Sequence, residues 1–264
     1  MDLGERAARI SWYHTIELAP GVVTPGLFDL RPWVTRYGLP DRLDGRRVLD
    51  VGSYDGFWAF EMERRGAVEV VALDLDEEAR LDWPPRRRPS QFQNRLRGEG
   101  FRLAKEALGS RVERVIGSIY EADPAELGVF DLVFCGMVLI HLRDQLLALE
   151  RIARLCRGTF ISAEEYDPVC GLVPFPVSRY RADRDAAVVF WQPSLRTWRR
   201  LLWSAGFDEV RTHGRFKVAS SEGYAVRHAV HHAAGSVTAA PADTLRAGET
   251  VPGPAPQPSI ELRP

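Results

Sequence analysis

Short apolar runs alternate with amphipathic segments through most of the chain. Continuous apolar residues predict strands over 48–51, 68–74, 112–116, 130–135 and 159–163. Apolar residues at helical spacing predict helices over 57–65, 92–108, 143–156 and 195–205. Strands that alternate with helices indicate an α/β domain, with a mostly parallel sheet and helices on both of its faces.

Three further apolar runs follow the last helix, over 207–213, 216–219 and 224–232. They are separated by polar turns rather than by helices, so we expect an antiparallel pair at the sheet edge. The complete pattern predicts a seven-stranded, mostly parallel sheet with an antiparallel edge strand.

The regions outside this pattern suggest a division of the chain. Residues 1–46 carry aromatic residues and a predicted helix over 6–16, and we interpret them as a lid or cap segment before the main domain, 47–234. Within that domain, 167–193 is a long connection rich in proline, arginine and aromatic residues, which suggests a substrate-side insertion. Alanine, proline, glycine and threonine dominate 235–264, which predicts a disordered tail.

Composition narrows the class of protein. A formal net charge of −1 and a pI near 6.6 exclude a generally basic nucleic-acid binder, although they allow a local basic patch. The three cysteines have no metal-ligand spacing, and we expect His228, His231 and His232 on the sheet surface, so no metal site is predicted. An apolar stretch of about 18 residues is also missing, which predicts a cytoplasmic protein without a membrane span.

The first strand ends in a turn of acids and glycines, Asp50-Val-Gly-Ser-Tyr-Asp-Gly56. A helix and a second strand that ends in Asp74 follow it, which is the order of a nucleotide-binding βαβ unit. Glycines at 52 and 56 let the backbone approach a ligand, and Asp74 is placed to accept hydrogen bonds from ribose hydroxyls. Cofactor contacts are therefore predicted for Asp50, Gly52, Ser53, Tyr54, Gly56, Asp74 and Leu75.

The charge of the turn bears on the choice of nucleotide. Asp50 and Asp55 would repel the pyrophosphate of a dinucleotide, whereas they suit a sulfonium and an ammonium group. The turn therefore favours S-adenosyl-L-methionine over NAD as the cofactor.

These segments resemble class I S-adenosylmethionine-dependent methyltransferases, which implies a Rossmann-like fold. The turn keeps the first and last glycine of that class's Asp-x-Gly-x-Gly-x-Gly pattern, with Tyr54 at the middle glycine. The resemblance places Ser118 and Ile119, after the third strand, against the adenine. Met137, after the fourth strand, lies at the edge where ligands bind in open α/β sheets.

A narrower resemblance is to the family of the tRNA 5-(carboxy)methoxyuridine transferase and its shorter relatives, over about residues 10–232. Its motifs are Trp12-Tyr-His-Thr-Ile-Glu-Leu18, Val22-Val-Thr-Pro-Gly26, Met137-Val-Leu-Ile-His141 and Val189-Phe-Trp-Gln-Pro-Ser194. That family holds the extra carboxylate of carboxy-S-adenosylmethionine with a lysine before the first strand and a tyrosine before the histidine. Here the region before the strand has no lysine and the tyrosine position is Ile140, which favours ordinary S-adenosylmethionine and methyl transfer.

Three residues are candidates for removing a proton from the acceptor. His141 follows the fourth strand, and Glu164 follows the fifth together with Glu165. His14 is a third candidate if the N-terminal segment closes over the site. Histidine is the side chain best suited to this role near neutral pH, although His141 could instead cap a helix or line the adenosyl pocket.

The sequence therefore predicts a methyltransferase that acts by in-line transfer, with O-methylation of a small-molecule acceptor as the leading hypothesis. One alternative is methylation of the tRNA wobble uridine as 5-hydroxyuridine, and another is an adenosyl-binding module without catalysis. The identity of the acceptor and the oligomeric state are left open.

Overall fold

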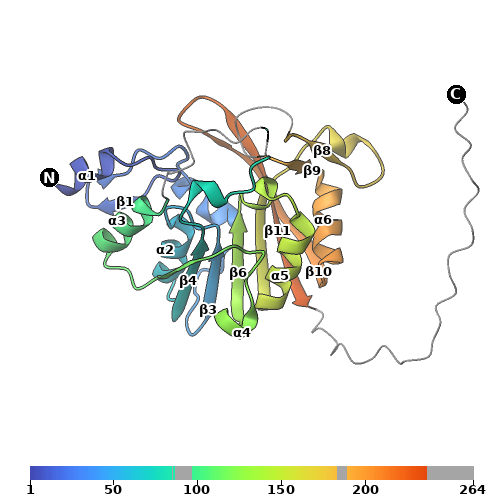
Figure 1. The fold of residues 1–264 in the computed structure, drawn as a ribbon, viewed down its shortest axis with the longest axis horizontal. Helices are drawn as coiled ribbons and strands as arrows, with labels where there is room; N and C mark the ends of the chain where they lie inside the picture. Colours follow the sequence, from blue (N-terminus) through green and yellow to red (C-terminus); the bar gives the residue numbers. More distant parts are fainter. Residues whose placement is uncertain (85, 87–96, 183–188, 237–264) are drawn as a thin grey trace, which may run out of the picture.

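The computed structural model describes residues 1–84, 86, 97–182 and 189–236. Within this part of the chain, a seven-stranded sheet forms the centre of the molecule (Figure 1). Its strands, in spatial order, are β10 (Phe207–Ala219), β11 (Ala225–Ser236), β7 (Cys156–Glu165), β6 (Phe130–Gly136), β3 (Arg47–Val51), β4 (Glu69–Asp74) and β5 (Glu113–Ile116). The predicted α/β class and the mostly parallel sheet are confirmed.

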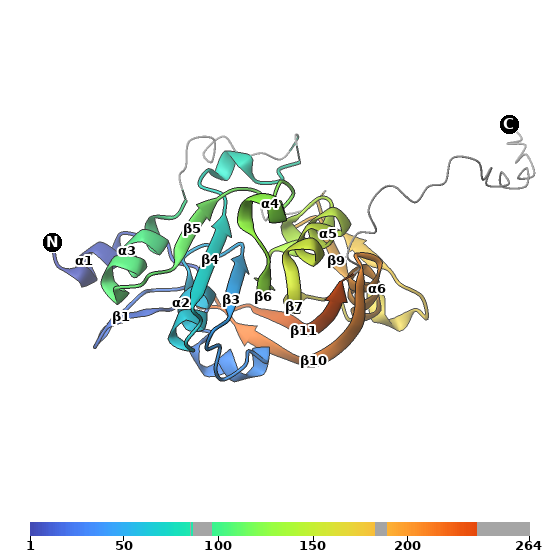
Figure 2. The same cartoon turned by 90° about the horizontal axis from the view of Figure 1, so that it is seen from below.

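Helices cover both faces of this sheet (Figure 2). On one face lie α2 (Phe57–Arg64) and α3 (Glu99–Leu108), and on the other α5 (Gln145–Leu155) and α6 (Leu195–Ser204). Each strand supplies both cores because successive side chains point to opposite faces, so Val48 packs with α2 and Leu49 with α5. Ser194 caps α6 as predicted, accepting a hydrogen bond from the Thr197 amide at 3.1 Å.

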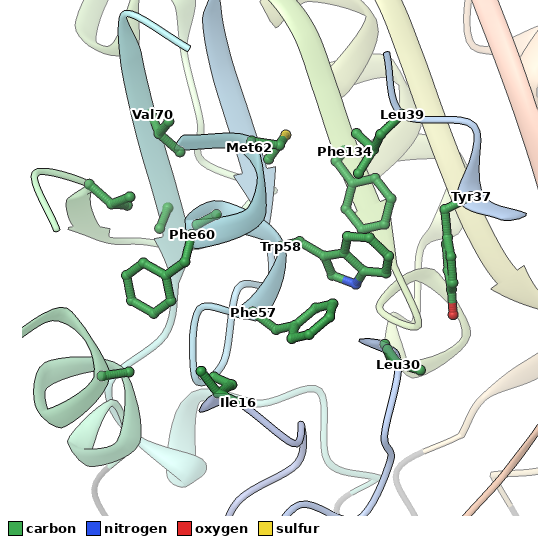
Figure 3. Packing of buried hydrophobic residues seen from close by; sticks show 14 of the residues in the cluster. Ile16, Leu30, Tyr37, Leu39, Phe57, Trp58, Phe60, Met62, Val70 and Phe134 are labelled. Carbon is green, nitrogen blue, oxygen red and sulfur yellow. The ribbon is translucent and has the colours of Figure 1, made fainter. Parts of the chain in front are cut away.

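Aromatic packing joins α2 to the sheet and to the segment before β3 (Figure 3). The ring of Trp58 lies between Phe134 of β6, at 4.6 Å between ring centroids, and Tyr37, at 4.3 Å. Tyr37 ends a short 3-10 helix, η1 (Arg31–Tyr37). The N-terminal region is therefore part of the core of the domain.

The predicted helix over 6–16 is wrong in extent. Helix α1 (Leu3–Ala8) ends before the aromatic residues, and residues 13–15 are extended beside Phe28, where the Thr15 amide donates to the Phe28 carbonyl at 2.9 Å. Two short strands, β1 (Glu17–Ala19) and β2 (Val22–Val23), follow. Extended backbone is favoured here because the neighbouring chain satisfies its hydrogen-bonding groups.

The final strands form the antiparallel pair that was predicted at the sheet edge, but they differ from the prediction in detail. The runs 207–213 and 216–219 form one strand, β10, with a register shift between Thr212 and Gly214. Strand β11 pairs antiparallel with both β10 and β7, so it is the reversed strand and lies one position in from the edge.

The histidines on β11 were expected on the sheet surface, and this is wrong for two of them. His231 is fully buried under α6 and His228 is buried beside Tyr37, while His232 is partly buried. Burial lowers the pKa of His228 and of His231 to about 4. The cause is that an imidazolium loses its hydration inside the protein.

The insertion 167–193 contains a 3-10 turn, η6 (Cys170–Leu172), and a hairpin of β8 (Ser178–Tyr180) and β9 (Trp191–Pro193). It contacts the turn η5 (Leu139–His141) after β6, where the Phe190 amide donates to the Ile140 carbonyl at 2.9 Å. Helix α4 (Pro124–Leu127) and the 3-10 turn η2 (Glu78–Arg80) complete the elements of the described residues. The predicted helix start at 92 and residues 237–264 of the predicted tail lie outside them, whereas Gly235 and Ser236 of that tail belong to β11.

We predict that His231→Leu makes the protein more resistant to acid. Between pH 6.5 and 4 the unfolded chain binds a proton at this histidine and the folded chain does not. As the pH is lowered through this range, His231 therefore reduces the free energy of unfolding of the wild type by about 1.4 kcal/mol per pH unit. The raised pKa values of Asp50 and Glu164 have the opposite effect on stability, since these buried carboxyls bind protons in the folded chain. This effect is the same in the wild type and in the variant, so it does not alter the difference between them.

Urea unfolding followed by circular dichroism at pH 7, 6, 5 and 4 measures this difference. The control is His213→Gln, because His213 is exposed on β10. A variant that loses stability with acid as steeply as the wild type would contradict the prediction.

Candidate active site

A cavity of about 380 Å³ lies at the carboxyl ends of β3, β4, β5 and β6. Many of the predicted site residues line it, namely His14, Gly52, Tyr54, Asp74, Leu75, Ser118, Ile119, Met137 and His141. These residues come from separate segments and meet because parallel strands end at the same edge of the sheet.

The turn after β3 brings backbone to the cavity wall. Gly52 has φ 72°, and a Cβ there would lie 2.3 Å from a methyl group of Val138. Tyr54 replaces the middle glycine of the pattern, yet it adopts the same left-handed region with φ 48°. Such a conformation is strained for a residue with a side chain, and it persists only where surrounding contacts hold it.

Asp74 supplies one such contact. Its Oδ2 accepts a hydrogen bond from the Tyr54 amide at 2.6 Å, and its Oδ1 accepts one from the Leu75 amide at 2.7 Å. Each carboxylate oxygen has a second lone pair, so the group can also accept hydroxyl hydrogen bonds from a ligand in the cavity.

Arg97 is a residue of the cavity that the sequence analysis missed. Its guanidinium lies 3.6 Å from Asp74 Oδ2 and 3.7 Å from a carboxylate oxygen of Glu78, and it stacks over the ring of Tyr54 at 4.7 Å. It precedes α3 and follows the connection after β4, so strand-end reasoning gave no signal for it.

Tyr120 and Asp82 close the end of the cavity beside Ser118 and Ile119. The Tyr120 hydroxyl donates to Asp82 Oδ2 at 2.6 Å, and the Arg143 amide donates to the same oxygen at 2.8 Å. Burial, followed by the bond to Asp82, raises the pKa of the Tyr120 phenol, so the hydroxyl stays protonated. This chain of contacts connects the segment after β4 to the start of α5.

Four predicted site residues do not line the cavity: Asp50, Ser53, Gly56 and Glu164. Gly56 has φ 90° and opens α2, where a Cβ would lie 2.5 Å from the ring of Phe60. Asp50 and Ser53 are buried beneath the turn, and burial raises the pKa of Asp50 to about 8. Neither Asp50 nor Asp55 faces the cavity, and its lining holds Arg80 and Arg97 beside Asp74 and Asp82, so the charge of the turn does not explain the choice of cofactor.

Glu164 is fully buried and supports a turn. Its Oε1 accepts hydrogen bonds from the Val138 amide at 3.1 Å and the Leu139 amide at 3.0 Å, and the Cys135 thiol lies at 3.7 Å. Burial raises the pKa of this carboxyl to about 8. The structure therefore does not bring Glu164 to the place where an acceptor could bind.

The two candidate histidines do reach the cavity, from different sides of the fold. His141 belongs to the turn η5 after β6, and its amide donates to the Val138 carbonyl at 2.9 Å. His14 comes from the N-terminal segment, together with Tyr13. Within the described residues, no group of three or more potential ligand side chains could hold a metal ion.

An adenosyl cofactor fits the cavity in shape and chemistry. Asp74 can receive the ribose hydroxyls, and the close contact of Gly52 with Val138 leaves the backbone of the turn at the ligand surface. Leu75, Ile119 and Met137 supply apolar walls suited to a flat ring. The protein is a class I S-adenosylmethionine-dependent methyltransferase with a Rossmann-like fold.

Residues 28–212 match the model of the family described as "Methyltransferase domain", and the chain belongs to that family. Membership makes the protein an enzyme of methyl transfer, so the hypothesis of a module without catalysis is set aside. No helix in the part of the chain that the structure describes is long and apolar enough to cross a bilayer.

Curated relatives are similar over part of their length. A tRNA U34 carboxymethyltransferase of Desulforapulum autotrophicum is 29% identical over 67% of this chain and 49% of its own. The enzyme of the same name from Alcanivorax borkumensis is 33% identical over 64% of this chain and 47% of its own. The chain thus spans about half the length of these relatives.

Two solved structures of the N-terminal domain of EvdMO1 share the fold. The one with S-adenosylhomocysteine bound has a TM-score of 0.63 and 18% identity, and it covers 89% of this chain and 98% of that one. The other was determined in the presence of S-adenosylhomocysteine and D-fucose, with a TM-score of 0.61, 19% identity and coverage of 89% and 97%.

We predict that Asp74→Asn weakens binding of S-adenosylhomocysteine by about 10- to 100-fold. The reason is that charge-assisted hydrogen bonds to the ribose, worth about 1.5–3 kcal/mol, are reduced to neutral ones. Isothermal titration calorimetry measures the change. Asp76→Asn is the matched control, since Asp76 pairs with Arg114 and does not line the cavity. Equal affinities in the two variants would contradict this role for Asp74.

Proposed function

We propose that the enzyme methylates a hydroxyl group of a small molecule. The observation that carries this proposal is the lining of the cavity, which contains Tyr13, His14 and His141 besides Asp74, the carboxylate expected to bind the ribose. Imidazole is suited to take the proton that a hydroxyl loses when it is methylated. Because Tyr13 and His14 line the cavity, they also support the prediction that residues 1–46 act as a lid.

A polar network that is joined to the turn η5, which carries His141, supports a hydroxylated acceptor. Arg181 donates to Gln192 Oε1 at 2.6 Å, and Gln192 is hydrogen-bonded in turn to Glu165 at the end of β7. The network is joined to the turn of His141, because the Arg181 amide donates to the Phe190 carbonyl and the Phe190 amide donates to the Ile140 carbonyl, both at 2.9 Å. Carboxylate, amide and guanidinium groups together can both donate to and accept from several hydroxyls.

Methylation of a wobble uridine in tRNA is the second candidate function. It is supported by the names of the curated relatives, and by the exposed arginines Arg196, Arg199 and Arg200 on α6, which could meet phosphate groups. The absence of a lysine before β3 and the presence of Ile140 favour the plain cofactor for either acceptor.

We predict turnover with small hydroxylated acceptors and unmodified methyl as the transferred group. The test incubates the enzyme with S-adenosylmethionine and a panel of phenols, methyl glycosides and free sugars including D-fucose, and measures S-adenosylhomocysteine by mass spectrometry. A parallel reaction contains tRNA with 5-hydroxyuridine at the wobble position. Each reaction is repeated with carboxy-S-adenosylmethionine in place of S-adenosylmethionine. Methylation of the tRNA alone would overturn the small-molecule proposal, and turnover with the carboxylated cofactor alone would overturn the choice of cofactor.

A further inference from the structure

Asp55 binds the N-terminal segment through three donors. Its Oδ2 accepts hydrogen bonds from the Tyr13 amide at 2.9 Å and the His14 amide at 2.8 Å, and its Oδ1 is paired with Nδ1 of the His14 ring. The side chain is 1% exposed, so these contacts are made away from water. A carboxylate from the turn before α2 thereby fixes both the backbone and the ring of a residue 41 positions earlier.

The rest of His14 is held equally closely. Its ring stacks on Phe57 with 5.3 Å between centroids, and its carbonyl accepts from the Thr24 hydroxyl at 2.9 Å. Gly26 lies directly against the peptide that follows, since a Cβ there would be 2.2 Å from the carbonyl carbon of His14. Asp55 and Phe57 therefore hold the ring, while Thr24 and Gly26 hold the backbone that carries it.

This orientation determines which ring nitrogen can meet a ligand. An ionised carboxylate only accepts hydrogen bonds, so Nδ1 carries the ring proton and Nε2 keeps its lone pair. Asp55 does not line the cavity, whereas His14 does. Nε2 is thus the nitrogen that remains for a molecule bound there.

We propose that His14 is the general base of methyl transfer and that Asp55 is its positioning residue. His14 Nε2 takes the proton of the acceptor hydroxyl while the acceptor oxygen bonds to the methyl carbon of S-adenosylmethionine. The carbon–sulfur bond breaks, its electron pair stays on sulfur, and S-adenosylhomocysteine leaves uncharged at sulfur. The imidazolium that forms is stabilised by the Asp55 carboxylate.

The contacts of Glu164 favour His14 over it as the base. The bonds of Glu164 go to backbone amides and to the Cys135 thiol, so this carboxylate supports the turn of His141 rather than orienting its ring. His14 has a buried carboxylate directly on its ring, which is the arrangement of a base held in its working tautomer. The inference rests on the proposed transfer to a hydroxyl, because such an acceptor must lose a proton.

Asp55→Asn tests the assignment with little change of shape. The Tyr13 and His14 amides both donate to the Oδ2 position, so the oxygen of the new amide must lie there. Its NH₂ group then faces Nδ1 as a donor, which forces the ring proton onto Nε2. Long-range ¹⁵N–¹H NMR of the protein without cofactor should show the Nδ1-H tautomer of His14 in the wild type and the Nε2-H tautomer in the variant.

The control is Asp29→Asn, a partly exposed residue of the same N-terminal region that pairs with Arg31. It should leave the His14 signals unchanged. A wild-type protein with the proton on Nε2, or an Asp55→Asn variant with an unchanged tautomer, would overturn the proposal. The NMR measurement of the His14 tautomer does not require a known acceptor.

Kinetics with the best acceptor of the hydroxyl panel provides the second readout. Asp55→Asn and His14→Gln should each lower kcat by about 100- to 10,000-fold, the range of general-base catalysis, while S-adenosylhomocysteine binding changes less than threefold. Full activity of His14→Gln together with loss of activity in His141→Gln would assign the base to His141 instead. Failure of the hydroxyl panel would overturn the proposed function, and the tautomer measurement would still decide the role of Asp55.

Discussion

The turn between β3 and α2 is the constraint on which the site depends. Three of its residues, Gly52, Tyr54 and Gly56, have φ values of 72°, 48° and 90°, and the chain reverses direction within five positions. Tyr54 keeps this conformation because its amide is bonded to Asp74. The same reversal turns Asp55 away from the cofactor cavity and toward the N-terminal segment. One backbone geometry thus positions both the ribose acid and the proposed catalytic pair.

Much of the fold and of the cofactor site could be predicted because both depend on local pattern. Apolar runs identify buried parallel strands, and the residues just after them must gather at one edge of the sheet. Asp74 and Met137 were found in this way, and the resemblance to class I methyltransferases added Ser118 and Ile119. The extent of β10 and the burial of His231 were missed, since they depend on which strand and helix pack there rather than on the local residues.

Carboxylates near strand ends show where sequence reasoning stops. Asp50, Asp55, Asp74 and Glu164 all lie in or beside such turns, yet only Asp74 of these four lines the cavity. Glu164 bonds the amides of a turn, Asp50 lies beneath the turn after β3, and Asp55 binds a segment 41 residues earlier in the chain. These partners are set by tertiary contacts, so no spacing rule distinguishes the four.

The N-terminal segment that brings Tyr13 and His14 to the cavity is also joined to residues much later in the chain. Phe28, which pairs with residues 13–15, forms a bridge with Ser220, and the Ser221 amide donates to the Leu27 carbonyl at 2.8 Å. Residues made first therefore depend on the tip of the β10–β11 hairpin, which is made much later. During synthesis on the ribosome, the turn after β3 emerges early, but the contacts that hold the segment of Tyr13 and His14 are completed only after residue 221 has emerged.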